Sequence, residues 1–191
     1  GLTAVAAYVL GSVPFGIVMA RMFGLGDLRQ VGSGNIGATN VLRTGNKLAA
    51  FLTLLGDAGK GGAAVLLARA ALGEDAAQLA GFAAFLGHCF PVFLRFKGGK
   101  GVATFLGTLL ALSFPIGLAA CATWAVIAAV FRISSLAALV AAALSPMAAT
   151  LLGAPQAMAL CVALAFLIGL RHHENINRLL KGSEPRIGKK G

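Results

Sequence analysis

The sequence predicts an all-α membrane protein, a polytopic bundle of about seven transmembrane helices built as a single domain over residues 1–191. Of the 191 residues, 58% are hydrophobic and only 12% are charged, whereas a soluble domain carries about a quarter charged residues. The mean hydropathy is +0.87. A chain with so few polar side chains does not cover its own surface in water, so the apolar excess must face lipid. The same composition excludes a disordered chain, a collagen and a disulfide scaffold.

Apolar runs of about 20 residues define the expected spans. They cover residues 2–23, 48–72, 77–94, 102–114, 116–131, 134–152 and 156–170. The fourth and fifth runs are short and separated only by Ser113-Phe114-Pro115, so five or six spans with a re-entrant segment is an alternative. The first run lacks the basic start and the small-residue cleavage site of a signal peptide, and we interpret it as a span.

The positions of lysine and arginine predict the orientation, because basic residues near helix ends remain on the cytoplasmic side. When alternate connections are assigned to one side, 14 of the 16 basic residues fall on it: Arg21, Arg29, Arg43, Lys47, Arg95, Lys97, Lys100, Arg132, Arg171, Arg178, Lys181, Arg186, Lys189 and Lys190. The opposite connections hold Glu74 and Asp75. We therefore expect the N-terminus outside and the C-terminus in the cytoplasm.

Three polar connections fall on that basic side, and the first is residues 32–40, followed by Arg43. Its glycines allow backbone N–H groups to turn inward as a nest for an anion. Its neutral donors are Ser33, Asn35, Thr39 and Asn40. The segment matches GxGxxG, but no strand precedes it and no βαβ unit surrounds it, so we do not expect a dinucleotide site. An interfacial turn that packs closely is the alternative interpretation.

The second connection contains Lys97-Gly98-Gly99-Lys100-Gly101 and leads directly into the fourth apolar run. Glycines bring the backbone close to a ligand, lysines supply charge, and the following helix presents its positive end. Together these features suit phosphate. Leu94 stands where a Walker A loop needs its first glycine, so the segment is not a nucleotide loop of that kind. A basic turn that binds anionic headgroups is the alternative.

The third connection is residues 171–178. Its residues His172, Asn175 and Arg178 recur at intervals of three, so they share a face if the preceding helix continues; the alternative is a capped helix end. Arg43, Lys100 and Arg178, with His172 as a further candidate, supply more cationic capacity than one phosphate monoester needs, and we infer a site for two phosphates.

Several polar or reactive residues lie inside the apolar runs. We expect Asp57 and Lys60 to form an ion pair, because charges within a membrane are costly, and we expect the glycines around them to break or kink the second span. We interpret His88 as a packing or hydrogen-bonded residue. Cys89, Cys121 and Cys161 are expected to be small packing residues. Candidate metal ligands do not cluster at ligand spacing, so no metal is expected.

The three connections resemble the motifs of the bacterial acyl-phosphate:glycerol-3-phosphate acyltransferases, the PlsY family. They read Gly-Ser-Gly-Asn-Ile-Gly-Ala-Thr-Asn at 32–40, Gly-His-Cys-Phe-Pro at 87–91 with Phe-Lys-Gly-Gly-Lys-Gly-Val-Ala-Thr at 96–104, and Arg-His-His-Glu-Asn-Ile-Asn-Arg at 171–178. The resemblance covers nearly the whole chain in length, motif order and span pattern.

This resemblance implies an integral enzyme of the bacterial inner membrane with its active site on the cytoplasmic face. The implied reaction moves a fatty acyl group from acyl phosphate to the 1-hydroxyl of glycerol 3-phosphate, giving lysophosphatidic acid and inorganic phosphate in the first step of bacterial phospholipid synthesis. The resemblance implies no cofactor and no nucleic-acid partner. It implies contact with membrane lipid and functional coupling to the enzyme that supplies acyl phosphate.

The family motifs also assign residues. The implied catalytic residues are Ser33, Asn35, Arg43, Lys100, His172 and Asn175, and the implied substrate-binding residues are Gly34, Thr39, Asn40, Gly98, Gly99 and Ser135. The first loop and the Gly98–Gly99 pair would surround the acyl phosphate, and Arg43, Lys100, His172, Asn175 and Ser135 would hold glycerol 3-phosphate. His173 stands where the family usually has Arg or Lys, which leaves open whether His172 or His173 contacts substrate.

The residues favour a mechanism without a covalent acyl-enzyme. The sequence contains no His-x-x-x-x-Asp dyad, no Ser/His/Asp arrangement and no activated cysteine. Acyl phosphate already carries a good leaving group, so positioning and charge stabilisation can suffice. We expect Lys100 and Arg43 to act as electrostatic clamps and Asn35 as an orienting donor. A transporter for a phosphorylated metabolite and a structural subunit anchored in lipid are the alternatives from other classes.

Overall fold

The computed structural model describes residues 1–188, and within them every regular element is helical. The helices are α1 (Leu2–Gly11), α2 (Phe15–Met22), α3 (Ala38–Arg43), α4 (Lys47–Leu72), α5 (Glu74–Cys89), α6 (Val102–Leu112), α7 (Phe114–Phe131), α8 (Ser134–Leu151), α9 (Met158–Arg171) and α10 (His173–Leu180), with short 3-10 turns η1 (Leu28–Gln30), η2 (Val92–Leu94) and η3 (Pro155–Ala157). Lys189 and Lys190, expected on the basic side, lie outside the described residues.

All seven apolar runs form helices. Five helical segments are long and apolar enough to cross a membrane: Leu2–Met22, Lys47–Leu72, Glu74–Leu94, Phe114–Phe131 and Ser134–Leu151. The pair Pro155–Arg171 and His173–Leu180 adds a sixth if its 65° bend is counted within one span, and Val102–Leu112 is a shorter apolar helix. Large hydrophobic side chains remain exposed along these helices, Val130 and Leu151 among them, as expected for surfaces that face lipid.

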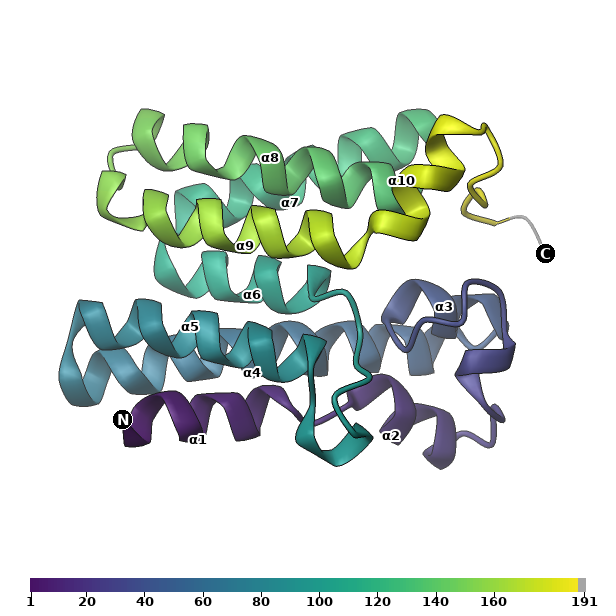
Figure 1. Cartoon of the computed structure of the whole chain (residues 1–191), viewed down its shortest axis with the longest axis horizontal. Coiled ribbons are helices and arrows are strands. Elements are labelled where there is room, and N and C mark those ends of the chain that lie inside the picture. Colours follow the sequence, from purple (N-terminus) through teal and green to yellow (C-terminus); the bar gives the residue numbers. More distant parts are fainter. Residues whose placement is uncertain (189–191) are drawn as a thin grey trace.

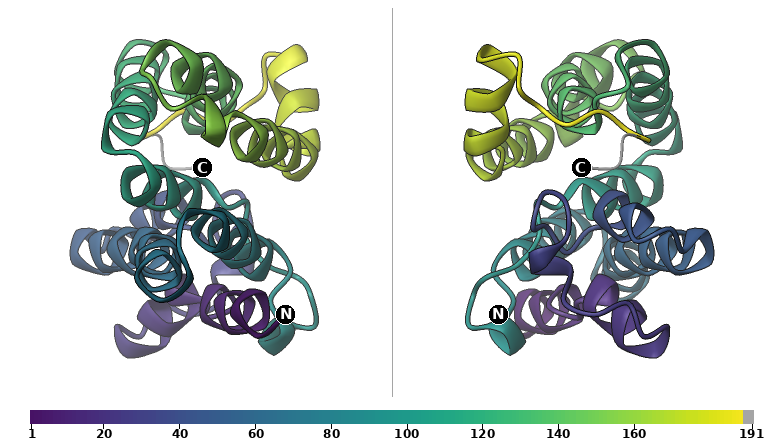
Figure 2. Two further views of the ribbon diagram at one scale, coloured as in Figure 1. Left: turned by 90° about the vertical axis from the view of Figure 1, so that its left-hand side faces the viewer. Right: turned by 90° about the vertical axis from the view of Figure 1, so that its right-hand side faces the viewer.

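Helix α6 lies at the centre of the bundle. In Figures 1 and 2 it separates α1, α4 and α5 from α7, α8 and α9. It packs against α4 on one side and α7 on the other. Phe85 of α5, Phe105 and Leu109 of α6, Ile116 of α7 and Leu164 of α9 are fully buried in a common core. This core fixes the two groups of helices relative to each other, which decides where their connecting loops meet.

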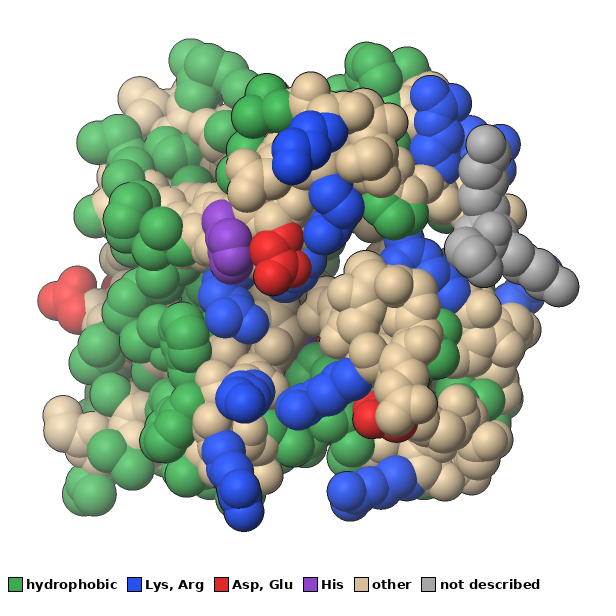
Figure 3. Space-filling model, turned by 45° about the vertical axis from the view of Figure 1, so that its right-hand side comes forward, with side chains coloured by type: hydrophobic (Ala, Val, Ile, Leu, Met, Phe, Trp, Pro, Cys, Tyr) green, Lys and Arg blue, Asp and Glu red, His purple; other side chains and the backbone are tan. Residues whose placement is uncertain are grey.

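The polar connections gather at one end of the molecule. Figure 1 places α3 and α10 at the right-hand end, with the α4–α5 turn and the α8–α9 connection at the opposite end. Figure 3, which turns that right-hand end toward the viewer, shows lysine and arginine side chains gathered from the middle to the right of the view, while hydrophobic side chains are most frequent on its left. The three motifs, distant in sequence, are therefore neighbours in space.

The expected break in the second span is wrong, because α4 is continuous from Lys47 to Leu72. Its glycines serve close packing instead: a Cβ atom on Gly61 would lie 2.6 Å from the Thr104 carbonyl oxygen of α6. The expected ion pair is confirmed, with Lys60 Nζ 2.7 Å from Asp57 Oδ1 and both side chains buried. Lys60 is buried inside the bundle, where its Nζ also donates to the Val13 carbonyl oxygen.

Candidate active site

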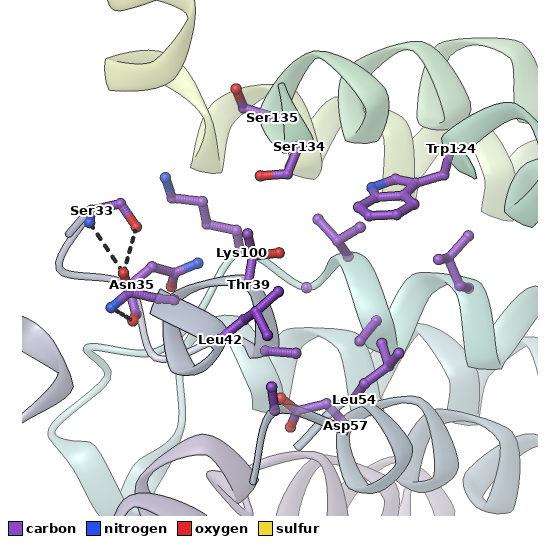
Figure 4. A pocket seen from close by; sticks show the side chains of 18 of the residues that line it. Ser33, Asn35, Thr39, Leu42, Leu54, Asp57, Lys100, Trp124, Ser134 and Ser135 are labelled. Atoms are coloured by element: carbon purple, nitrogen blue, oxygen red, sulfur yellow. Dashed lines mark hydrogen bonds between the residues drawn. The ribbon is translucent and has the colours of Figure 1, made fainter. Parts of the chain in front are cut away.

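A cavity of about 500 Å³ opens among the three motifs and extends between α4, α6 and α7. Its polar end is lined by nine of the residues that the motifs assigned: Ser33, Asn35, Thr39, Asn40, Arg43, Lys100, Ser135, His172 and Asn175. Its deeper wall is apolar and includes Phe51, Leu54, Leu106 and Trp124. Figure 4 shows Lys100 extending between the loop that carries Ser33 and the helix that carries Ser134 and Ser135. Such a cavity suits an amphiphile with an anionic headgroup.

Asn40 shapes the first loop. Its amide nitrogen donates to the carbonyl oxygens of Leu28 and Asn35, at 2.8 and 2.7 Å, and its Oδ1 accepts from the Ser33 N–H at 3.1 Å. Gly34 N–H donates to the Val31 carbonyl oxygen. The N–H groups of Ser33 and Gly34 are therefore satisfied within the protein and do not contribute to the anion nest expected in residues 32–40. Gly34 does not line the cavity, and both amide hydrogens of Asn40 hold the loop and are not available to substrate.

The side chains of this first loop remain placed for binding. Ser33, Asn35 and Thr39 all line the cavity. Asn35 Oδ1 accepts from the Ile36 N–H at 2.9 Å, which fixes the orientation of the amide. Arg43 is half-buried at the end of α3, and its Nη1 lies 3.4 Å from Asn40 Oδ1. Burial lowers the pKa of Arg43 below its usual range, but a guanidinium keeps its proton.

Gly98 and Gly99 of the second loop pack against α5 and do not line the cavity. The N–H groups of Gly98 and Gly99 donate to the carbonyl oxygens of Cys89 and His88, at 3.2 and 3.1 Å. A Cβ atom on Gly99 would overlap the imidazole Nε2 of His88. The structure therefore does not bring Gly98 and Gly99, which were expected around a substrate phosphate, to the cavity wall. Their backbone hydrogen bonds instead place Lys100 and the start of α6.

The start of α6 gives the site its expected positive helix end. Gly101 caps the helix with a φ of 82°, a conformation that glycine adopts without strain. Gly101, Val102 and Ala103 line the cavity. The positive end of the α6 dipole thus faces the same space as Lys100, which favours an anion there.

Lys100 is the cation at the centre of the polar end. Its Nζ donates to Asn175 Oδ1, so it links the second motif to the third. Burial lowers the pKa of Lys100, and the charge of Arg178 lowers it further, while Glu184 opposes this shift. An anionic ligand beside Lys100 would restore the favourable environment of the charged amine.

The third motif does not continue the preceding helix. The chain bends by 65° between α9 and α10, and His172 stands at the bend. His172 and Asn175 are buried and line the cavity, whereas His173 is exposed and its Nδ1 contacts the Leu170 carbonyl oxygen. Of the two histidines that the sequence left open, His172 is the one at the cavity. Arg178 is not among the lining residues, and the expected shared face therefore breaks at this position.

His172 has a defined tautomer. Its Nδ1 lies 2.8 Å from the Ile168 carbonyl oxygen, which only accepts, so Nδ1 carries the hydrogen and Nε2 is the acceptor. Burial lowers the pKa of His172 to about 4. The ring is neutral at pH 7 before ligand binds, and Nε2 is able to accept a hydrogen bond from a hydroxyl group.

No group of three or more His, Cys, Asp or Glu residues within residues 1–188 has an arrangement that could hold a metal ion. The donors at the polar end are amines, guanidinium groups, amides and hydroxyls. This donor set suits phosphate, which accepts charge-assisted hydrogen bonds.

Comparison with known proteins places this architecture in a family. The model of the family described as glycerol-3-phosphate acyltransferase matches residues 1–182. The chain belongs to the glycerol-3-phosphate acyltransferase family.

Relatives resemble the chain over nearly its full length. A protein named glycerol-3-phosphate acyltransferase from Jannaschia sp. (strain CCS1) is 80% identical over 99% of this chain and 93% of its own length. One of the same name from Cereibacter sphaeroides (strain ATCC 17025 / ATH 2.4.3) is 67% identical over 99% of this chain and 90% of its own length. These sequence identities show that the similarity extends over nearly the whole chain and is not limited to the three motifs.

Two crystal structures of PlsY, described as an integral membrane glycerol 3-phosphate acyltransferase, share the fold. The glycerol 3-phosphate form has a TM-score of 0.92 and 42% identity, and the lysophosphatidic acid form has a TM-score of 0.89 and 38% identity. Each comparison covers 98% of this chain and 94% of the solved chain. The sequence-based prediction of an all-α membrane helix bundle of the PlsY family is confirmed.

Two charged residues of this family member were missed by the sequence analysis as parts of the site. Arg171 donates from Nε and Nη2 to the carbonyl oxygens of Gly99 and Gly98, at 3.1 and 3.0 Å, and its guanidinium lies over the Phe90 ring. Glu184 accepts from Ser135, Asn175 and Arg178. Arg171 was expected only as the first residue of the third motif and as a basic residue of the cytoplasmic side, and Glu184 stands in the sequence as one acid between Lys181 and Arg186.

His88 and Asp57 also belong to the cavity wall. Imidazole Nδ1 of His88 lies 3.4 Å from Asp57 Oδ1, the same oxygen that pairs with Lys60. The imidazole Nε2 of His88 faces the backbone of Gly99. His88 therefore packs against the second loop and supports it. Of the three cysteines, Cys89 and Cys161 are buried in the core as expected, whereas Cys121 is half-buried and lines the apolar part of the cavity.

Proposed function

We propose that the chain transfers a fatty acyl group from acyl phosphate to the 1-hydroxyl of glycerol 3-phosphate, releasing lysophosphatidic acid and inorganic phosphate. The observation that carries the proposal is one cavity that joins a cationic, donor-rich end to an apolar end. The family name and the glycerol 3-phosphate and lysophosphatidic acid forms of PlsY support the same acceptor and product.

The polar end divides between the two substrates. Arg43, Lys100, Ser135, His172 and Asn175 hold glycerol 3-phosphate, because they supply two cations and several neutral polar groups from four separate parts of the chain. Ser33, Asn35 and Thr39 hold the phosphate of the donor, beside the positive end of α6. The apolar wall, with Leu54, Leu106 and Trp124, receives the first part of the acyl chain.

The reaction proceeds in one displacement. The 1-hydroxyl oxygen forms a bond to the acyl carbonyl carbon, the bond from that carbon to the phosphate oxygen breaks, and the hydroxyl proton passes to a substrate phosphate oxygen. No acyl group is attached to the protein. The cations stabilise the charge that develops, and holding both reactants in alignment contributes about 7–11 kcal/mol in favourable cases. Asn35 orients the donor, and His172 Nε2 accepts from an acceptor hydroxyl.

Donor choice gives the direct test of this function. Purified protein is incubated with glycerol 3-phosphate and either palmitoyl phosphate or palmitoyl-CoA, and both lysophosphatidic acid and released phosphate are measured. We expect product only with palmitoyl phosphate, at one phosphate per product, because the site recognises a phosphate leaving group. Equal use of palmitoyl-CoA, or a trapped acyl-protein adduct, would count against the proposal. Glycerol phosphate flux into liposomes without product would instead indicate a transporter.

We also propose that the cavity opens to the cytoplasm from the bacterial inner membrane, and that the protein acts downstream of the enzyme that supplies acyl phosphate. The basic residues at the cavity end of the bundle support this orientation. In cells carrying Lys97→Cys or Asp75→Cys, an impermeant maleimide should label Asp75→Cys in intact spheroplasts and Lys97→Cys only after permeabilisation. The reverse pattern would contradict the orientation.

A further inference from the structure

The segment after α10 crosses the polar end of the cavity. Residues 181–188 run from the end of α10 back to the start of α8. The backbone of Ile187 forms hydrogen bonds with Arg132, its N–H donating to the Arg132 carbonyl oxygen at 2.6 Å and its carbonyl oxygen accepting from Arg132 Nη2 at 3.0 Å. We call residues 181–188 the strap. Its middle carries Glu184, which lines the cavity.

The Glu184 carboxylate is held by donors from two other elements. Oε1 accepts from Ser135 Oγ at 2.7 Å and from Asn175 Nδ2 at 2.5 Å, and Oε2 accepts from Arg178 Nε at 2.7 Å. The side chain is only 6% exposed. Burial raises the pKa of Glu184, and the three hydrogen bonds outweigh it, so the net shift is downward. Glu184 is therefore an anion seated among donors.

These donors are the ones that the proposed function gives to glycerol 3-phosphate. Ser135 and Asn175 were assigned to glycerol 3-phosphate, and Lys100 donates to Oδ1 of the same Asn175 amide. A carboxylate and a phosphate both present oxygens and negative charge, so they compete for the same hydrogens. An anionic ligand that enters beside Glu184 is also repelled by it. Occupation of this subsite by phosphate requires that Glu184 leave it.

We propose that Glu184 is an internal competitor at the acceptor-phosphate subsite, displaced only by an acceptor that carries its own strong anion. The inference rests on the proposed function and deepens it, because it makes Glu184 a specificity-determining residue. A dianionic glycerol phosphate replaces the hydrogen bonds that Glu184 gives up, and it also gains Arg178, which the departing carboxylate releases. Neutral glycerol cannot replace the charge, so the carboxylate stays and excludes it.

The variant Glu184→Gln tests this directly, because glutamine keeps the size of the side chain and removes the charge. We expect the KM for glycerol 3-phosphate to fall about tenfold, and its Kd measured by calorimetry in detergent micelles to fall equally, while the KM for palmitoyl phosphate stays unchanged. We also expect the wild-type protein to reject glycerol and Glu184→Gln to use it detectably as an acceptor. The control Asp75→Asn removes one exposed charge at the opposite end and should leave every constant unchanged.

Hydrogen exchange of the wild-type protein gives a second measurement that needs no variant. Saturating glycerol 3-phosphate should accelerate exchange at the amides of Ser183 and Ile187, which are hydrogen bonded to Arg178 and Arg132 in this structure. Glycerol at the same concentration should not.

The outcomes separate the two proposals. A Glu184→Gln variant whose affinity for glycerol 3-phosphate falls or is unchanged overturns the inference, as does slower exchange of the strap on binding. If the wild-type protein transfers no acyl group to glycerol 3-phosphate, the proposed function fails. In that case, inorganic phosphate should still bind more tightly to Glu184→Gln than to wild type if the competition exists, and equal binding would overturn the inference separately.

Discussion

Replacing Lys100 by alanine should reduce kcat/KM for glycerol 3-phosphate by about 10²–10³-fold, the loss typical when one donor to developing charge is removed from an active site. Lys100 is the cation that joins the second and third motifs through Asn175, and it lies beside the positive end of α6. Without it, the bound phosphates lose their central counter-charge. Steady-state assays with palmitoyl phosphate as the donor measure the effect.

Lys97→Ala is the matched control for this variant. Lys97 belongs to the same loop and has the same charge, but its side chain is exposed and it does not line the cavity. We expect its activity to stay within about twofold of wild type, as for a surface charge. Full activity of Lys100→Ala in a folded preparation, or equal losses in both variants, would refute the role given to Lys100.

Replacing Asp57 by alanine should destabilise the protein by about 3–5 kcal/mol, because it leaves the buried ammonium of Lys60 without its counter-charge. The two side chains are 3% and 1% exposed, and they pair at 2.7 Å inside a continuous helix. His88 also loses its carboxylate partner, so the second loop is less well supported. The midpoint of unfolding in detergent, followed by helical circular dichroism, measures the loss.

The double variant Asp57→Ala/Lys60→Met separates charge burial from packing. It removes both charges and keeps an unbranched side chain at position 60, so we expect it to recover most of the stability lost in Asp57→Ala. Asp75→Ala, at an exposed position, is expected to change the unfolding midpoint little. A double variant as unstable as Asp57→Ala would show that the pair stabilises the protein by some means other than mutual neutralisation.

The sequence predicted which side chains line the cavity more accurately than it predicted which backbone N–H groups face it. Lys100, His172 and Asn175 were placed correctly at one cavity because each occupies a polar motif at the end of an apolar run. Gly98 and Gly99 were not, because a glycine-rich loop beside lysines looks the same whether its N–H groups face a ligand or a neighbouring helix. Their partners are carbonyl groups of α5, and that contact depends on how α5 ends.

Tertiary packing also explains why the break expected in α4 does not occur. Glycines lower intrinsic helix propensity, and Gly56, Gly59, Gly61 and Gly62 suggested a break. Tertiary packing overrides that propensity, since Thr104 of α6 approaches the backbone at Gly61 too closely for a larger residue. The Asp57–Lys60 pair was predicted correctly because its members are three residues apart on one helix, so its geometry is local.

Hydropathy and the spacing of charges are properties of short stretches of chain, and they by themselves determined the helical membrane class, the seven apolar runs and the three polar motifs. The tertiary structure alone decided which donors face the cavity and which are used internally. It brought Arg171 to the second loop and Glu184 to Ser135 and Asn175, contacts that join residues up to 73 positions apart. The physical reason is that a hydrogen bond depends on which groups become neighbours, and the packing of α6 between the two groups of helices sets those neighbours.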